Sequence, residues 1–283
     1  MKRHIAFLIC SLVMWSCGEV VMDLPAHDWR IVVESYLSVG DSVVVRVSQT
    51  SPYNQGYSGS YVGASNATVI LAVDESEHLL TEYPYSATGQ RPYLYPTLYG
   101  LPKSVLSIPS DAALSLRVQY KGKEVRAACN VLPRTRIESF RIIESPTDSF
   151  LLDLEIFAAF PPGASYYLVE GKSETLFNGT PALLPFFYDV VRVAGDGSRK
   201  TIVLSNPRRE VVWRVPGIAK RVLFLRRTDK SFYDFDIALK AQSSEVGGKK
   251  KILGTDPVMI PTNILGGVGI FTVANTDSLS LLQ

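Results

Sequence analysis

The chain has 283 residues, of which 46% are hydrophobic and 20% are charged, and its formal net charge is +2. This composition is typical of a folded globular protein and excludes an intrinsically disordered chain, which would have fewer apolar residues and a larger net charge. Beyond residue 17, no apolar run approaches the ~18 residues that a membrane-spanning helix requires.

The start of the chain has the features of an export signal. Two basic residues precede an apolar run over residues 5–15, and Ser16 stands directly before Cys17. This pattern predicts a secretory signal peptide over residues 1–16. A bacterial lipoprotein signal peptidase requires a small residue before such a cysteine, whose thiol is diacylated before cleavage. We therefore expect a mature chain that begins at lipidated Cys17 and is attached to the membrane by lipid alone; the alternative is ordinary cleavage near Ser16 and free secretion.

Cysteine usage leaves one thiol in the folded part of the chain. Cys10 lies in the signal peptide and Cys17 takes the lipid, which leaves only Cys129. An intramolecular disulfide is then impossible. Cys129 follows two alanines in an apolar, strand-like stretch, so we expect a buried, inert side chain.

After a tether at 17–28, short stretches with alternating apolar residues predict β-strands. The strands are expected at 29–37, 43–47, 67–73, 79–83, 114–118 and 125–131. The first two should form an antiparallel hairpin, and the last two should be joined by a turn at Lys121 and Gly122. Four prolines interrupt residues 85–109, which predicts an irregular segment or a sheet edge. We assign residues 29–133 to an immunoglobulin- or fibronectin-like β-sandwich domain.

The second half repeats the strand pattern and adds one helix. A linker is predicted at 134–139, followed by strands at 150–160, 166–170, 187–193, 201–204, 210–215 and 221–226. Residues 230–242 carry Phe232, Phe235 and Leu239 at helical spacing, with Asp229 or Ser231 available to cap the first turn. The sequence therefore predicts an all-β protein in which residues 134–283 form a second antiparallel sandwich domain with a short helix.

Five motifs occur together in one order along the chain: Ile31–Glu34, Ser48–Tyr53, Ser231–Phe235, Pro261–Ile264 and Gly266–Phe271. With them the mature chain resembles, over nearly its whole length, the Bacteroidota lipoprotein family called domain of unknown function 4249. Members are typically encoded beside TonB-dependent outer-membrane receptors, so the resemblance implies an accessory lipoprotein of an uptake system, without naming a ligand. The glycines of the last motif allow the backbone to turn sharply or to pass close to another segment.

Residues that could support catalysis or metal binding are few. His27 and His78 have no histidine or cysteine partner at metal-ligand spacing. The pairs Glu75 with Glu77 and Asp153 with Glu155 could be imagined as an acid and a base, but alternate residues on a strand are more often solvated charges. A Gly-Lys-Ser sequence at 171–173 lacks the other glycine of a phosphate-binding loop and suggests a hairpin turn. We expect a non-enzymatic protein without a metal or cofactor.

Tyrosines are concentrated in segments predicted to be loops. Tyrosine combines a broad apolar ring with a hydroxyl and few rotamers, which suits a recognition surface. The alternative is that these rings pack beneath the loops. The candidate binding surface consists of Tyr53, Tyr57, Tyr61, Tyr93, Tyr95 and Tyr99.

Basic residues are concentrated in the C-terminal half. Residues 192–251 contain fifteen Lys and Arg against six Asp and Glu. Such a region could meet lipid phosphates or an acidic receptor surface, or could be an ordinary solvated face. Nucleic acid is not an expected partner of an exported lipoprotein.

Three functions follow from these observations. The first is an outer-membrane lipoprotein that works with a TonB-dependent receptor in nutrient capture, on either leaflet. The second is a structural or adhesive surface lipoprotein that contacts host or matrix. The third is a carboxylate-dependent hydrolase.

Overall fold

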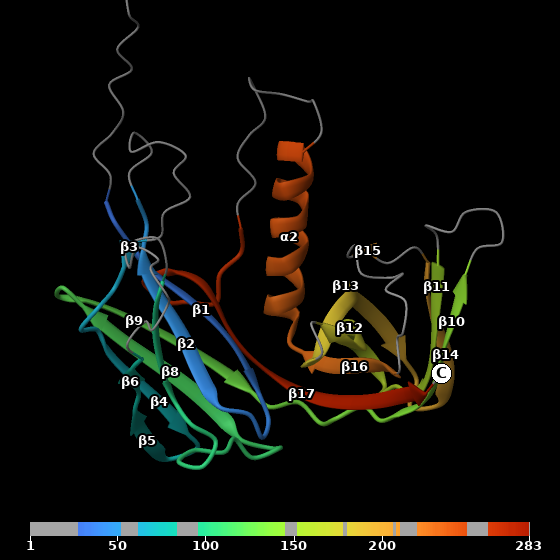
Figure 1. Ribbon diagram of the computed structural model, residues 1–283. Coiled ribbons are helices and arrows are strands. Elements are labelled where there is room, and N and C mark those ends of the chain that lie inside the picture. Colours follow the sequence, from blue (N-terminus) through green and yellow to red (C-terminus); the bar gives the residue numbers. More distant parts are fainter. Residues whose placement is uncertain are drawn as a thin grey trace, which may run out of the picture.

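The computed structural model describes residues 28–51, 62–83, 96–144, 152–177, 180–205, 208–209, 220–247 and 260–282. These residues form mainly antiparallel β-sheets with one helix near the C-terminus, which confirms the predicted all-β class (Figure 1). No helix in this part of the chain is long and apolar enough to cross a membrane.

The N-terminal half is built from two sheets that enclose one core. One sheet contains β1 (Ile31–Ser38), β2 (Val43–Gln49), β3 (Val62–Gly63), β7 (Thr97–Leu101) and β6 (Thr81–Glu82). The other has the order β5 (Ser76–Leu79), β4 (Thr68–Val73), β8 (Ala113–Tyr120) and β9 (Lys123–Asn130). Alternate residues of β1, β2, β4 and β8 point inward, so Ile31, Val45, Leu71 and Leu116 meet in the core between the sheets.

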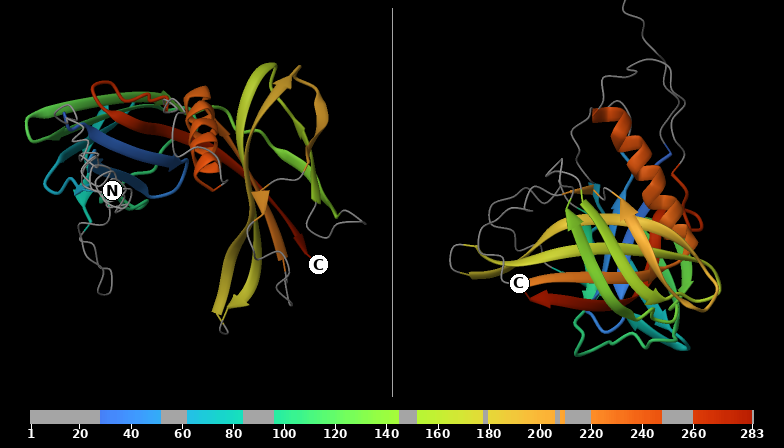
Figure 2. Two further views of the ribbon diagram at one scale, coloured as in Figure 1. Left: turned by 90° about the horizontal axis from the view of Figure 1, so that it is seen from above. Right: turned by 90° about the vertical axis from the view of Figure 1, so that its right-hand side faces the viewer.

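The C-terminal half also consists of two packed sheets. Its longer sheet contains β12 (Gly163–Phe177), β13 (Thr180–Gly195), β15 (Arg208–Arg209) and β16 (Lys220–Thr228). The shorter sheet contains β10 (Ile137–Glu144), β11 (Leu152–Ala159) and β14 (Arg199–Ser205). Leu154, Ile156, Tyr167 and Leu225 are buried between them. The paired strands β12 and β13 form a long arm that is visible from above and from the side (Figure 2).

The last strand, β17 (Val268–Leu282), belongs to both halves. Its first part runs parallel to β1, from the pair Val32 and Val268 to the pair Ser38 and Ala274. Its second part, residues 275–282, pairs antiparallel with β16. β17 therefore joins the sheets of the two halves into one ten-stranded sheet (Figure 1). The prediction of two domains at 29–133 and 134–283 did not include a strand that belongs to both.

The helix α2 (Lys230–Gly247) stands where the two halves meet, and it extends five residues beyond the predicted end at residue 242 (Figure 1). Asp229 caps it, because its carboxylate accepts a hydrogen bond of 2.8 Å from the backbone nitrogen of Phe232. Phe232 packs edge-on against Tyr36 of β1 and lies in a buried cluster with Leu168 of β12 and Ile270 of β17. The apolar face of α2 thus contacts strands from both halves.

A charged cluster fixes the middle of α2 to β13. Lys240 lies 2.6 Å from a carboxylate oxygen of Asp236 and 3.2 Å from one of Asp189. Tyr188 donates a hydrogen bond of 2.8 Å to the other oxygen of Asp236. Burial, followed by the charge of Asp236, raises the pKa of Tyr188.

Several local predictions need correction. Residues 171–173 do not form a hairpin turn: they continue β12, which is paired on both sides, with a register shift between Gly171 and Lys172. β10 starts inside the predicted linker at 134–139. β7 is a regular strand within the proline-interrupted segment, between β2 and the two-residue β6 near the end of the sheet.

Candidate functional site

The predicted site residues fall into two groups. Cys17 and the tyrosines at 53, 57, 61, 93 and 95 lie outside the described residues, so lipidation and the tyrosine surface stay predictions.

Tyr99 is a correction, because it is 1% exposed and belongs to the core rather than to a recognition surface. Its hydroxyl donates a hydrogen bond of 2.6 Å to the carbonyl oxygen of Ala64 and accepts one of 2.8 Å from the backbone nitrogen of Ala67. Burial, with the nearby carboxylate of Glu82, raises the pKa of Tyr99 to about 12. The pairing of β7 with β2 places this ring inside the sandwich.

The glycine-containing motif at 261–271 has a defined structural role. The side-chain amide of Asn263 donates a hydrogen bond of 2.7 Å to the carbonyl oxygen of Phe271 and accepts one of 2.9 Å from its nitrogen. Gly269, with a φ of +113°, passes so close to β1 that an added Cβ would lie 2.0 Å from the carbonyl oxygen of Val33. The expected close backbone approach is therefore confirmed.

The same motif covers part of the outer edge of β9. Leu265 exchanges two backbone hydrogen bonds with Arg126, of 2.7 Å and 3.1 Å. An added Cβ on Gly266, whose φ is +81°, would lie 3.0 Å from the carbonyl oxygen of Glu124. The motif thus holds Leu265 beside β9 with its side chain 76% exposed.

Strand register aligns the outward side chains of the sheet β5-β4-β8-β9 in rows, because directly opposite residues share a face. One row consists of Leu79, Ile70, Arg117, Arg126 and Leu265. The next consists of Glu77, Ala72, Ser115 and Ala128, and a third of Thr68, Gln119 and Glu124. The small side chains of Ala72, Ser115 and Ala128 in the second row leave space beside the two arginines of the first.

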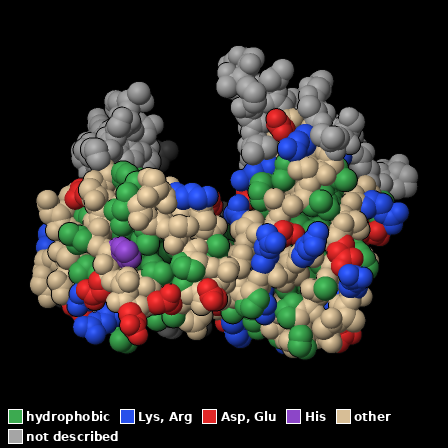
Figure 3. Space-filling model, turned by 90° about the horizontal axis from the view of Figure 1, so that it is seen from below, with side chains coloured by type: hydrophobic (Ala, Val, Ile, Leu, Met, Phe, Trp, Pro, Cys, Tyr) green, Lys and Arg blue, Asp and Glu red, His purple; other side chains and the backbone are tan. Residues whose placement is uncertain are grey.

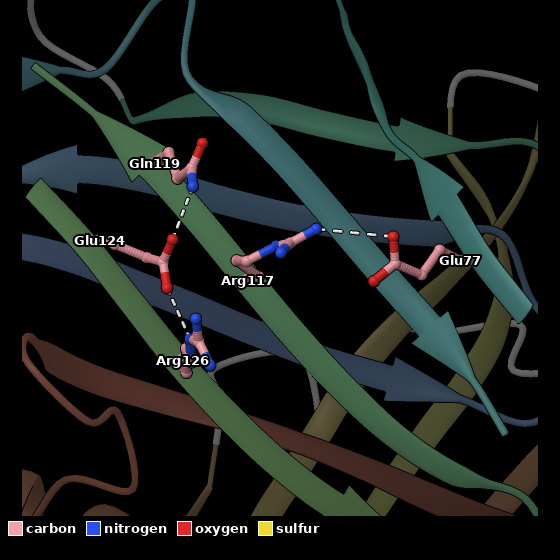
Figure 4. Close-up of polar contacts among 5 residues, drawn as sticks. All are labelled: Glu77, Arg117, Gln119, Glu124 and Arg126. Atoms are coloured by element: carbon pink, nitrogen blue, oxygen red, sulfur yellow. Dashed lines mark hydrogen bonds and ion pairs between the residues drawn. The ribbon is translucent and has the colours of Figure 1, made fainter. Parts of the chain in front are cut away.

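Polar contacts connect these rows (Figure 4). The side chain of Arg117 reaches across β4 to Glu77, at 3.5 Å between Nη2 and Oε2. Glu124 accepts hydrogen bonds of 2.6 Å from Gln119 and 2.5 Å from Nε of Arg126, and these two contacts lower its pKa. Among the described residues, the terminal nitrogens of Arg126 have no protein partner.

The space between these rows is an open hollow of about 450 Å³. Its lining residues are Glu77, Ser115, Leu116, Arg117, Arg126, Ala127, Ala128, Asn263 and Leu265. It therefore combines guanidinium donors with a carboxylate, a hydroxyl and an exposed leucine side chain. This arrangement can bind a ligand through hydrogen bonds and apolar contact.

The hollow was not predicted from the sequence, although a signal was present. A two-residue turn at Lys121 and Gly122 places Arg117 opposite Arg126 by counting back along both strands. The contribution of Leu265 had no such signal, since it comes from a segment more than a hundred residues away.

Apart from Glu77, the chemical candidates among the described residues do not line the hollow. Glu155 is bound by Arg141, with 2.6 Å between Nη2 and Oε2. Burial, followed by the charge of Asp229, raises the pKa of Cys129 to about 12, so its thiol stays protonated near neutral pH. Within the described ranges, no group of three or more His, Cys, Asp or Glu residues could hold a metal ion.

Basic residues of the C-terminal half are interspersed with acidic ones on the face seen from below (Figure 3). Arg226 lies 3.0 Å and Lys172 lies 3.1 Å from the carboxylate of Glu170. Arg199 lies 2.5 Å from that of Glu138. These ion pairs reduce the local positive charge that the sequence count suggests.

Comparisons with known proteins give little direct information on function. No curated protein matches the chain. Among solved structures, 105 chains match, including bovine butyrophilin, at 10% sequence identity over 70% of this chain and 92% of that chain. The TM-score for butyrophilin is 0.22, too low to indicate a common arrangement of the whole chains. The family model described as "Domain of unknown function (DUF4249)" matches residues 18–280, and the chain belongs to that family.

Proposed function

We propose that the protein is a non-enzymatic outer-membrane lipoprotein that acts as an accessory or ligand-capture partner of a TonB-dependent uptake receptor. The observation that carries this proposal is the family membership over residues 18–280, directly after the predicted lipidation site Cys17. The resemblance to lipoproteins encoded beside such receptors supplies the partner.

The geometry supports a binding role. The hollow on the sheet β5-β4-β8-β9 is open, and arginine, serine and leucine side chains border it. A surface of this kind can contact a solute or a partner without chemical change. The shared strand β17 keeps this surface connected to the C-terminal half.

Purification of the native complex tests the proposal. The full chain carries an affinity tag at its C-terminus, outer membranes are solubilised gently, and mass spectrometry identifies proteins recovered in stoichiometric amount. We expect a TonB-dependent receptor with the native protein and its loss with Cys17→Ala, which cannot be lipidated. Recovery of the lipidated protein alone, in a detergent that preserves a known receptor complex, would contradict the proposal.

A further inference from the structure

We propose that the hollow beside Leu265 binds the oxyanion group, carboxylate or phosphate, of a small ligand whose apolar part contacts the leucine. Arg117 and Arg126 are directly opposite on β8 and β9 and both border the hollow. Guanidinium groups bind carboxylate and phosphate through paired, charge-assisted hydrogen bonds. The inference rests on the proposed function only in taking this surface as the ligand-contact site.

The terminal guanidinium nitrogens of Arg126 are available to a ligand. Glu124 engages Nε of Arg126 and is held in place by Gln119 (Figure 4). This contact orients the guanidinium while both terminal nitrogens stay without a partner among the described residues. The side chain of Arg126 is 63% exposed, so a ligand can reach it.

Arg117 is held only weakly by its carboxylate partner. The distance to Glu77 is 3.5 Å, and the two side chains are 37% and 63% exposed. Exposed pairs of this kind contribute little to stability, so a ligand oxyanion can replace Glu77 at Arg117. Glu77 is then a competitor of the ligand rather than a part of its site.

The remaining walls suit an apolar group of modest size. Leu265 is 76% exposed, and its backbone is bound to β9 at Arg126, so its side chain stays beside the guanidinium. Ser115 and Ala128 are directly opposite on the floor and leave room for the ligand. Burial of an aliphatic group against Leu265 would add affinity in proportion to the apolar area covered.

NMR titration of the lipidated full chain in lipid nanodiscs tests this inference, with empty nanodiscs as the blank. The probes are isocaproate, its uncharged amide isocaproamide, and isoamyl phosphate, which share a branched apolar end. We expect at least one anionic probe to bind at least tenfold more tightly than the amide. The tighter of the two anions identifies carboxylate or phosphate as the recognised group. Equal binding of the amide, or no binding of either anion, would overturn the proposal.

Variants separate a ligand site from a structural ion pair. Arg117→Gln and Glu77→Gln break the same contact, so a structural role would change binding in the same direction in both. We expect Arg117→Gln and Arg126→Gln to weaken anion binding at least tenfold, and Glu77→Gln to strengthen it a few fold. Leu265→Ser should weaken it several fold.

Arg141→Gln is the matched control, because Arg141 also forms an exposed pair with a glutamate on neighbouring strands but does not line the hollow. It should leave binding unchanged, and an equal loss in this variant would overturn the proposal. The titration contains no receptor. Failure of anion binding therefore leaves the receptor partnership standing, and failure of receptor recovery leaves the anion site standing.

Discussion

Gly269 excludes a side chain for two reasons, a positive φ and a close approach to the backbone of β1. Its φ of +113° is unfavourable for other residues, and an added Cβ would lie only 2.0 Å from the carbonyl oxygen of Val33. We expect Gly269→Ala to lower the free energy of unfolding by about 3–5 kcal/mol, because it combines backbone strain with a clash between backbones. Urea denaturation measures this.

Gly122 provides the control for this substitution. Its φ is +77°, but nothing lies within 4 Å of an added Cβ. Gly122→Ala should therefore lower stability by only about 1–2 kcal/mol, the strain of a left-handed residue. Equal losses in the two variants would show that close approach to β1 is unimportant.

The buried hydroxyl of Tyr99 should make the folded protein less stable at alkaline pH, where it would ionise. Burial raises its pKa from 10.0 to about 12 in the folded protein, so the neutral hydroxyl is favoured by folding. This contribution is complete below pH 10, the unfolded pKa, and is lost as pH rises through about 12.

Tyr99→Phe removes the group that titrates. Below pH 10 the variant should be less stable by about 1–3 kcal/mol, because the backbone nitrogen of Ala67 loses its acceptor. The difference between the two proteins should narrow between pH 10 and 12. Chemical denaturation across this range measures it, and a constant difference would contradict the role of the hydroxyl.

At the scale of elements, α2 depends on a partly buried charge. Lys240 is 15% exposed and faces Asp236 and Asp189. Lys240→Met would leave two carboxylates without their cation, and we expect it to lower the free energy of unfolding by about 3–5 kcal/mol. Lys230 pairs with Asp234 at the same helical spacing but is 64% exposed. Lys230→Met should change the thermal midpoint little, and similar effects in both variants would refute the distinction.

Alternation of apolar and polar residues predicted most strands because it reflects burial of one face. β1, β2, β8 and β9 follow it closely. β17 was missed, because in its second part polar residues such as Asn275, Thr276 and Asp277 interrupt the apolar pattern. β10 was missed because a register shift between Ile137 and Ser139 interrupts the alternation at its start.

At the scale of the whole molecule, β17 should make the two halves unfold together. Residues 268–274 stabilise the N-terminal sheet and residues 275–282 the C-terminal one, so loss of either half removes a partner of the other. We expect one cooperative transition in scanning calorimetry. A flexible insert of about six Gly and Ser residues between Ala274 and Asn275 should separate it into two, because such linkers behave as random coils.

The same insert between Gly197 and Ser198 is the control, because it lengthens a turn after β13 without separating the parts of β17. It should preserve the single transition. Two transitions in the unmodified protein would refute the proposed coupling.

The sequence by itself determined the all-β class, most strands, the helix and the requirement for glycine near the C-terminus. These features depend on neighbours in the chain, on a repeating pattern of burial or on backbone freedom. Only the tertiary structure decided that β17 lies beside β1, that Tyr99 is buried and that Leu265 stands next to Arg126. Those contacts join segments far apart in sequence, and their partners are selected by packing of the whole core rather than by any local pattern.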